Sequence, residues 1–216
     1  MKKTIISLLA LVFIYSCTPQ DAPITFTDSR DGKVYKTVTI GSQVWMAKNL
    51  AYLPSVVGPD TYSHTEPYYY VYGYNGTFVA AAKGTTNYQT YGVLYNWPAA
   101  LTACPDGWHL PSVAEWTQLT DYLGGTSVAG GKMKETGTAH WDSPNTGATN
   151  SSGFTALPGG CRFFDGSFWY IGDVGFWWSS TQLHTDTAWT SDLSYLFSSR
   201  GSYSKGHGFS VRCVRN

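Results

Sequence analysis

Aromatic rings, carboxylates and amides gather in two segments of the second half of the chain, where they could bind a sugar. The segments are Trp141-Asp142-Ser143-Pro144-Asn145 and Phe163-Phe164-Asp165-Gly166-Ser167-Phe168-Trp169-Tyr170. Planar rings can stack on the apolar face of a pyranose, while carboxylates and amides hydrogen-bond to its hydroxyls. The candidate ligand-binding residues are therefore Asp142, Asn145, Asp165, Phe168 and Trp169.

A structural role for this region is the alternative. Asp165-Gly166 is a favoured sequence for a type I′ hairpin turn, in which both central residues need positive φ. Each candidate residue could then stabilise the turn or the core instead of contacting a ligand.

Signals for catalysis or metal binding are weak. The histidines are scattered, and His140-Trp141-Asp142 with His184-Thr185-Asp186 offers at most a speculative zinc set. Gly131-Lys132-Met133 lacks the hydroxyl that a phosphate-binding loop needs after its lysine, and no Gly-x-Ser-x-Gly elbow occurs. The sequence therefore predicts a chain with no enzymatic activity and no metal.

The first residues form a predicted secretory signal with a lipid attachment site. Lys2 and Lys3 precede an apolar stretch that is too short to span a bilayer comfortably but suits a signal peptide. The following Ile14-Tyr15-Ser16-Cys17 resembles the bacterial lipobox, in which cleavage precedes a cysteine that is then acylated. The predicted organisation is a signal peptide over 1–16, a lipid-anchored tether over 17–26 that begins at Cys17, and one domain over 27–216.

Lipidation at Cys17 would place the protein in the cell envelope. Several acyl chains on one residue hold a protein stably on a membrane. Thr18 follows the cysteine instead of the Asp associated with retention in the inner membrane, so we expect the outer membrane. An ordinary secreted protein with a chance cysteine is the alternative.

Composition excludes two broad classes of protein. The chain has 216 residues, of which 13% are charged and 16% aromatic, with 14 basic and 14 acidic side chains. Because the charges balance, the chain lacks the excess of positive charge that attracts the phosphate groups of nucleic acids. We therefore expect no nucleic-acid partner. The aromatic content suffices for a large core, which excludes a disordered chain.

The elements that position the candidate residues follow from local patterns. Residues 32–41 alternate as a strand, and Gly41-Ser42 suits a two-residue type II′ turn into a second strand over 43–46. Asn96-Trp97-Pro98 begins one predicted helix, and the capping box of Ser112 and Glu115 begins another that ends at Gly124. Further strands are predicted over 154–157, 161–164, 168–171, 176–181, 188–193 and 209–214. The fold class is therefore α+β, with two short helices, small antiparallel sheets and a long loop-rich second half.

Several motifs resemble those of a known family. They are Asp31-Gly32-Lys33-Val34-Tyr35-Lys36, Trp45-Met46-Ala47-Lys48-Asn49-Leu50, Tyr91-Gly92-Val93-Leu94-Tyr95-Asn96-Trp97, Gly107-Trp108-His109-Leu110-Pro111-Ser112, Ala156-Leu157-Pro158-Gly159-Gly160, Phe176-Trp177-Trp178-Ser179-Ser180-Thr181 and Gly208-Phe209-Ser210-Val211-Arg212-Cys213-Val214-Arg215. On these motifs the chain is identified as a member of the Fibrobacter succinogenes major paralogous domain family over about residues 27–216. The resemblance implies a C-type-lectin-like fold, distantly shared with formylglycine-generating enzymes, and no established activity.

The resemblance also bears on the cysteines. Once Cys17 is acylated three remain, and their spacing alone leaves three pairings open. Cys104 and Cys213 lie beside or within family motifs and resemble the disulfide that joins the first helix region to the last strand of lectin-like domains. Cys161 stands where the family usually has Tyr, and we interpret it as a buried thiol. The enzymes use a pair of closely spaced cysteines, which this chain lacks.

The remaining expectation is a binding function. We expect a surface-anchored module that recognises a glycan or another surface protein; the alternative is a structural or assembly component of the envelope. Trp177, Trp178 and Trp189 fit core strands of the family, and His109 lies in a motif where a structural hydrogen bond is expected. Calcium could be held by carboxylates and amides in a lectin-like fold, but the Glu-Pro-Asn and Gln-Pro-Asp sugar motifs are absent.

Overall fold

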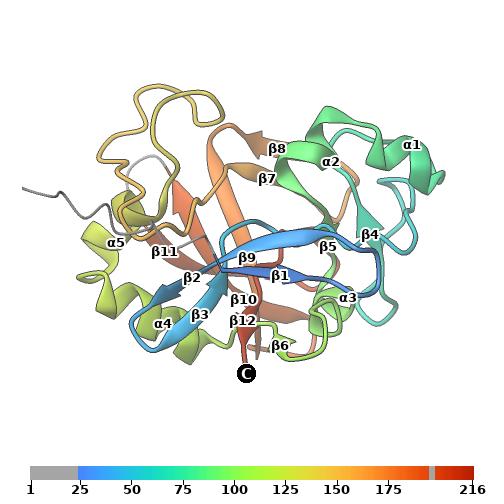
Figure 1. Ribbon diagram of the computed structural model, residues 1–216. Helices are drawn as coiled ribbons and strands as arrows, with labels where there is room; N and C mark the ends of the chain where they lie inside the picture. The colour runs from blue at the N-terminus through green and yellow to red at the C-terminus, as the bar shows by residue number, and fades with distance from the viewer. Residues whose placement is uncertain (1–23, 195–197) are drawn as a thin grey trace, which may run out of the picture.

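The described part of the chain is a mixed structure of short helices and curled sheets. We analysed a computed structural model, in which residues 24–194 and 198–216 are described. Those residues contain five short helices, two five-stranded sheets and one two-stranded sheet (Figure 1). The predicted combination of short helices and antiparallel sheets is therefore confirmed, except that one strand pair of the second sheet is parallel.

The first sheet joins the beginning of the domain to its end. Its strands, in the spatial order β1-β2-β3-β12-β6, are β1 (Thr25–Thr27), β2 (Val34–Ile40), β3 (Gln43–Met46), β12 (Val214–Arg215) and β6 (Trp108–His109). Ile40 pairs with Gln43 across Gly41-Ser42, and Gly41 has a φ of +61°, so the predicted hairpin with a two-residue turn is confirmed. The insertion of β12 between β3 and β6 places the C-terminal segment inside the fold.

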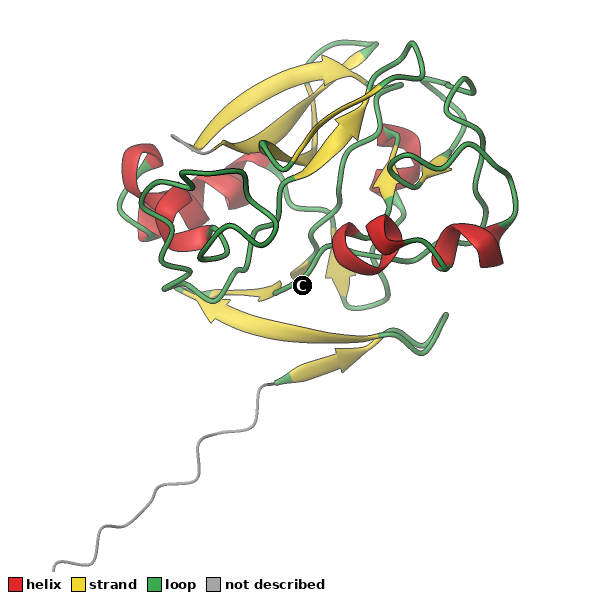
Figure 2. Cartoon of the chain, turned by 90° about the horizontal axis from the view of Figure 1, so that it is seen from above, coloured by secondary structure: helices red, strands yellow, loops and turns green. Residues whose placement is uncertain are grey.

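The second sheet has a hydrophobic core on each of its faces. Its strands, in the order β11-β10-β9-β7-β8, are β11 (Ser198–Ser204), β10 (Thr187–Ser194), β9 (Val174–Gln182), β7 (Gly159–Arg162) and β8 (Phe168–Ile171). Phe176 and Trp178 on β9 belong to one core cluster, while Trp177 between them belongs to the other. A strand buried on both faces needs consecutive apolar residues, which explains this run of rings. Figure 2 shows the two sheets on opposite sides of the molecule.

The two predicted helices are confirmed, and their capping side chains act as expected. They are α3 (Trp97–Leu101) and α4 (Val113–Tyr122). The Asn96 side chain accepts a hydrogen bond from Ala99 N, and Ser112 and Glu115 form the complete capping box.

The expectation of only two helices is wrong, because the described residues form three more. These are α1 (Val79–Lys83), α2 (Thr86–Tyr91) and α5 (Thr126–Met133). In α5, a Cβ on Gly131 would overlap the carbonyl oxygen of Gly147, so close packing selects glycine there despite its poor helix propensity. Tertiary packing therefore stabilises a helix that local propensity does not favour.

Strand predictions failed where pairing depends on distant segments. Residues 154–157 contribute only an isolated bridge between Lys134 and Ala156, and in the segment 209–214 only Val214 belongs to a strand of the sheet. The structure adds β11, a Ser- and Gly-containing edge strand without apolar alternation, and the short pair β4 (Tyr69–Tyr70) and β5 (Leu94–Tyr95). Such strands carry little local signal because their partners supply the hydrogen bonds.

The predicted disulfide is confirmed. Cys104, just after α3, is bonded to Cys213, and Cys161 is a free, buried thiol. The bond closes a loop of 109 residues in sequence separation. It therefore ties the helical region to the last strand.

A buried arginine joins the two sheets. Arg212 is 0% exposed, and its guanidinium donates hydrogen bonds to the Asn49 side-chain oxygen and to the carbonyl oxygens of Met46, Phe154 and Thr155. Its partners are neutral oxygens, and burial lowers the pKa of Arg212 to about 9. The Asn49 oxygen also accepts a hydrogen bond of 2.8 Å from Trp177 Nε1. One polar cluster thus holds β3, the loop at residue 154 and β9 together.

The disulfide yields the first prediction. Replacing Cys104 and Cys213 by Ser should lower the free energy of unfolding by roughly 3 to 5 kcal/mol, because the unfolded chain regains the entropy of a loop of about a hundred residues. Denaturant unfolding of the oxidised proteins measures the change. Cys161→Ala is the control and should cost about 1 kcal/mol, as expected for a small cavity. A non-reduced peptide map that links Cys161 to either other cysteine would contradict the assignment.

The arginine yields the second prediction. Arg212→Leu should lower the free energy of unfolding by about 3 kcal/mol or more, because it leaves several buried carbonyl oxygens without a donor. Chemical denaturation measures this loss, and exposed Arg215→Leu serves as the matched control with a change below about 1 kcal/mol. Equal stability of the two variants would show that the buried hydrogen bonds do not hold the sheets together.

Candidate functional site

Exposed aromatic rings gather on the hairpin formed by β7 and β8. Trp169 is 56% exposed, and Phe164 and Tyr170 are also exposed. We call the surface formed by Phe164, Asp165, Ser167, Trp169 and Tyr170 the hairpin surface. Exposed apolar rings that form a contiguous patch are typical of binding surfaces.

The predicted type I′ turn at Asp165-Gly166 is wrong. Gly166 has a φ of +87°, but Asp165 does not have positive φ, whereas a type I′ turn requires it at both residues. Gly166 N donates to Phe163 O at 3.0 Å, and Phe163 N donates to Ser167 O at 2.8 Å. The connection is thus a three-residue loop in which Gly166 takes the left-handed position.

Hydrogen bonds hold the Trp169 ring in place. Its Nε1 donates to Ser167 Oγ at 2.8 Å, and Ser167 Oγ in turn donates to Asp165 Oδ1 at 2.6 Å. Asp165 also accepts from Ser167 N at 3.0 Å, and these bonds from the Ser167 side chain and backbone lower the pKa of Asp165. The ring is therefore oriented before any ligand arrives, which reduces the entropy lost on binding.

A loop far away in the sequence supports the hairpin from one side. The buried Arg162 guanidinium donates to the carbonyl oxygens of Pro59, Thr61 and Gly206, with Nε at 2.7 Å from Pro59 O. A Cβ on Gly166 would lie 2.7 Å from Asp60 Oδ1, so the exposed Asp60 carboxylate lies against the turn. The structure thus adds Asp60 to the candidate surface. Sequence reasoning missed it because no pattern links residue 60 to residue 166.

A buried histidine supports the base of the hairpin. The His207 ring lies 5.0 Å from Phe163, 5.6 Å from Phe164 and 5.7 Å from Phe209 between ring centroids. Burial lowers the pKa of His207, so the imidazole is neutral near neutral pH and packs as an aromatic ring. The buried His207 ring therefore packs against both Phe163 and Phe164 at the base of the hairpin.

The other predicted ligand residues do not join this surface. Phe168 is half-buried, with its ring 5.0 Å from that of Tyr72. Asp142 is exposed beside Gly172, after β8, whereas Asp165 precedes β8. Asn145 is only 6% exposed, and its amide donates to Glu135 O and Gly137 O. Asp165 and Trp169 are the predicted residues that the structure brings together.

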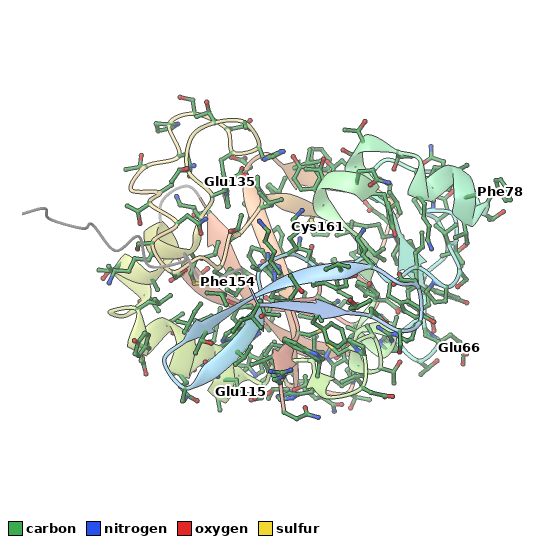
Figure 3. The ribbon with its side chains drawn as sticks, viewed as in Figure 1. Glu66, Phe78, Glu115, Glu135, Phe154 and Cys161 are labelled. Atoms are coloured by element: carbon green, nitrogen blue, oxygen red, sulfur yellow. A yellow bond between two sulfur atoms is a disulfide. The ribbon has the colours of Figure 1, made fainter. Side chains whose placement is uncertain are left out.

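Other titratable groups have structural partners or lie buried. His109 sits between Asn216 and Glu115, with Nε2 2.6 Å from Glu115 Oε1. Burial raises the pKa of Asp192 to about 7 and that of Cys161 to about 12. Figure 3 shows Cys161 within the fold. Within residues 24–194 and 198–216, no three His, Cys, Asp or Glu side chains are grouped to hold a metal ion.

The predicted lipid attachment at Cys17 falls outside the described residues. Over the part of the chain that the structure describes, none of the helices has the length and hydrophobicity to cross a bilayer.

Comparison with known proteins identifies the family. A model of the Fibrobacter succinogenes major domain matches residues 38–215. The search of curated proteins and the search of solved structures each found no match. The matched range includes β3, the disulfide, Arg212 and the β7–β8 hairpin. The chain therefore belongs to the Fibrobacter succinogenes major domain family.

Proposed function

We propose that this protein is a binding module that recognises a glycan through the hairpin surface and carries out no catalysis. The observation that supports the proposal is the exposed Trp169 ring, whose orientation is set by Ser167 and Asp165. The ring can stack on the apolar face of a sugar, while the carboxylates of Asp165 and Asp60 accept hydrogen bonds from its hydroxyls.

The proposed fold is C-type-lectin-like, as the resemblance of the sequence implied. A hairpin near the start, helices in the middle, a curled sheet in the second half and a disulfide from the helical region to the last strand support this assignment. The solution of an experimental structure followed by fold comparison would test it.

The proposed location is the outer membrane, with the chain held by lipid on Cys17. The signal-like segment and the cysteine at its end support this proposal. A surface protein as the ligand, or a structural role in the envelope without glycan binding, remains an alternative function. The exposed rings of the hairpin surface would suit a protein interface as well.

The ring should supply most of the binding energy. Stacking of one ring on a sugar contributes on the order of 1 kcal/mol through buried apolar area, and one net hydrogen bond contributes a similar amount. Because water competes for hydrogen bonds with exposed carboxylates, the ring should matter more than Asp165 or Asp60.

The third prediction tests this site. A glycan array probed with the mature chain carrying Cys17→Ser, with calcium and with chelator, should identify a glycan that binds in both conditions, because stacking on the exposed Trp169 ring needs no metal ion. Trp169→Ala should weaken binding of that glycan about tenfold, which corresponds to roughly 1.4 kcal/mol. Calorimetry measures the affinity, and the melting temperature should change little because the ring is exposed.

Two variants serve as controls for this prediction. Phe78→Ala removes a ring that is 69% exposed at the edge of the molecule, away from the hairpin, and should leave glycan binding unchanged (Figure 3). Trp177→Ala opens the core and should destabilise the fold by roughly 3 to 5 kcal/mol. If Trp169→Ala destabilises the fold as much as Trp177→Ala, the hairpin is a structural element and the proposed surface is wrong.

The fourth prediction concerns the anchor. Cys17→Ala should abolish lipid attachment and leave a soluble or unprocessed precursor, because no other cysteine follows the signal closely. Membrane fractionation and mass spectrometry of the expressed protein measure the outcome. A variant that still fractionates as a processed membrane protein would rule out lipidation at this residue.

A further inference from the structure

A cleft lies between β2 and α2, away from the turn of the hairpin. It has a volume of about 70 Å³ and is lined in part by Lys33, Tyr35, Lys48, Asn49, Tyr88 and Thr90. In Figure 1, α2 lies beside the β7–β8 hairpin and above β2. A cleft of this size has room for several waters or for one small charged group.

Lysine side chains converge on this cleft. Lys33, which is half-buried, and Lys48, which is exposed, both line it. Burial lowers the pKa of Lys33, and the nearby charges of Lys48 and Lys83 lower it further, while exposed Asp31 opposes the shift. Among the described residues, none of these lysines forms an ion pair with a carboxylate.

The position of Lys33 is held by an aromatic ring. Its Nζ lies 4.8 Å from the centroid of the Tyr88 ring, within the range of a cation–π contact. Tyr88 is itself fixed, since its hydroxyl donates to Ala51 O at 2.8 Å. Lys33 is therefore directed at the cleft wall instead of extending into solvent.

Two of the neutral side chains that line the cleft form hydrogen bonds within the fold. The Asn49 amide donates to Tyr91 O at 3.1 Å and to Ser210 Oγ at 3.2 Å, and Tyr35 Oη accepts from Ala51 N at 3.0 Å. Among the side chains that line the cleft, Lys33 and Lys48 carry the positive charges, and Thr90 adds a hydroxyl.

We propose that this lysine cleft binds one oxyanion, the carboxylate or sulfate group of an acidic sugar. The charges of Lys33 and Lys48 repel each other, the Asp31 carboxylate offsets part of this repulsion at Lys33 without forming an ion pair, and a bound anion removes the rest. Ammonium groups and a hydroxyl supply the donors that a carboxylate or sulfate oxygen accepts. The proposal depends on a surface separate from the hairpin surface and does not require Trp169.

The test is a titration of the mature chain carrying Cys17→Ser with sodium sulfate and with methyl glucuronide at constant ionic strength, followed by backbone NMR shifts. We expect saturable shifts at residues of the cleft with both probes and none with the neutral methyl glucoside. Lys33→Gln combined with Lys48→Gln should weaken binding at least tenfold. Lys33→Arg combined with Lys48→Arg should retain it, which separates loss of charge from loss of structure.

Lys132→Gln is the matched control, because Lys132 lines a different cleft, and it should leave the titration unchanged. Trp169→Ala should also leave it unchanged, so failure of the lysine cleft is distinguishable from failure of the hairpin surface. Absence of saturable shifts, or equal affinity of the Gln and wild-type proteins, would overturn the proposal. Binding to vesicles that contain phosphatidylglycerol without binding of either soluble anion would also overturn it, in favour of a lipid phosphate.

Discussion

The buried guanidinium of Arg212 is the constraint on which the fold depends. A charge can be buried only when its donors are satisfied, and here they reach three backbone carbonyls and the Asn49 oxygen. Those acceptors come from segments at about residues 46–49 and 154–155, and Asn49 adds Trp177 from β9. These segments therefore share one network of buried hydrogen bonds. The neighbouring Cys213 adds a covalent link to Cys104.

The connections made by Arg212, Asn49 and the disulfide stabilise the centre of the fold, so the strands and helices elsewhere can be short. The β9 strand separates two cores, and the C-terminal segment crosses from one to the other, with Phe209 in the first and Val214 in the second. The second sheet is buried on both faces and held at its central strand β9 by hydrogen bonds, so it supports a hairpin at its edge. The β7–β8 hairpin lies at such an edge. Its exposed rings are thus displayed on a rigid base, which is the condition for a preorganised binding surface.

The two candidate surfaces differ in the chemistry they offer. The hairpin surface presents an exposed indole beside Asp165 and Asp60 and suits the apolar face and hydroxyls of a neutral sugar. The lysine cleft presents Lys33 and Lys48 beside Tyr35 and Asn49 and suits an anion. The Tyr91 side chain of α2 lies against Gly159 at the start of β7, which is the end of the hairpin opposite the Asp165-Gly166 turn.

Local patterns in the sequence determined the elements whose signals lie within a few residues. The capping box of Ser112 and Glu115 and the turn at Gly41 depend on neighbours in the chain, so they were predictable, and the family motifs added the pairing of Cys104 with Cys213. Only the tertiary structure decided the rest. Edge strand β11, the placement of Asp60 at the hairpin turn and the convergence of the lysines depend on contacts between distant segments. Their physical cause is packing and hydrogen bonding across the fold, for which a linear sequence carries no periodic signal.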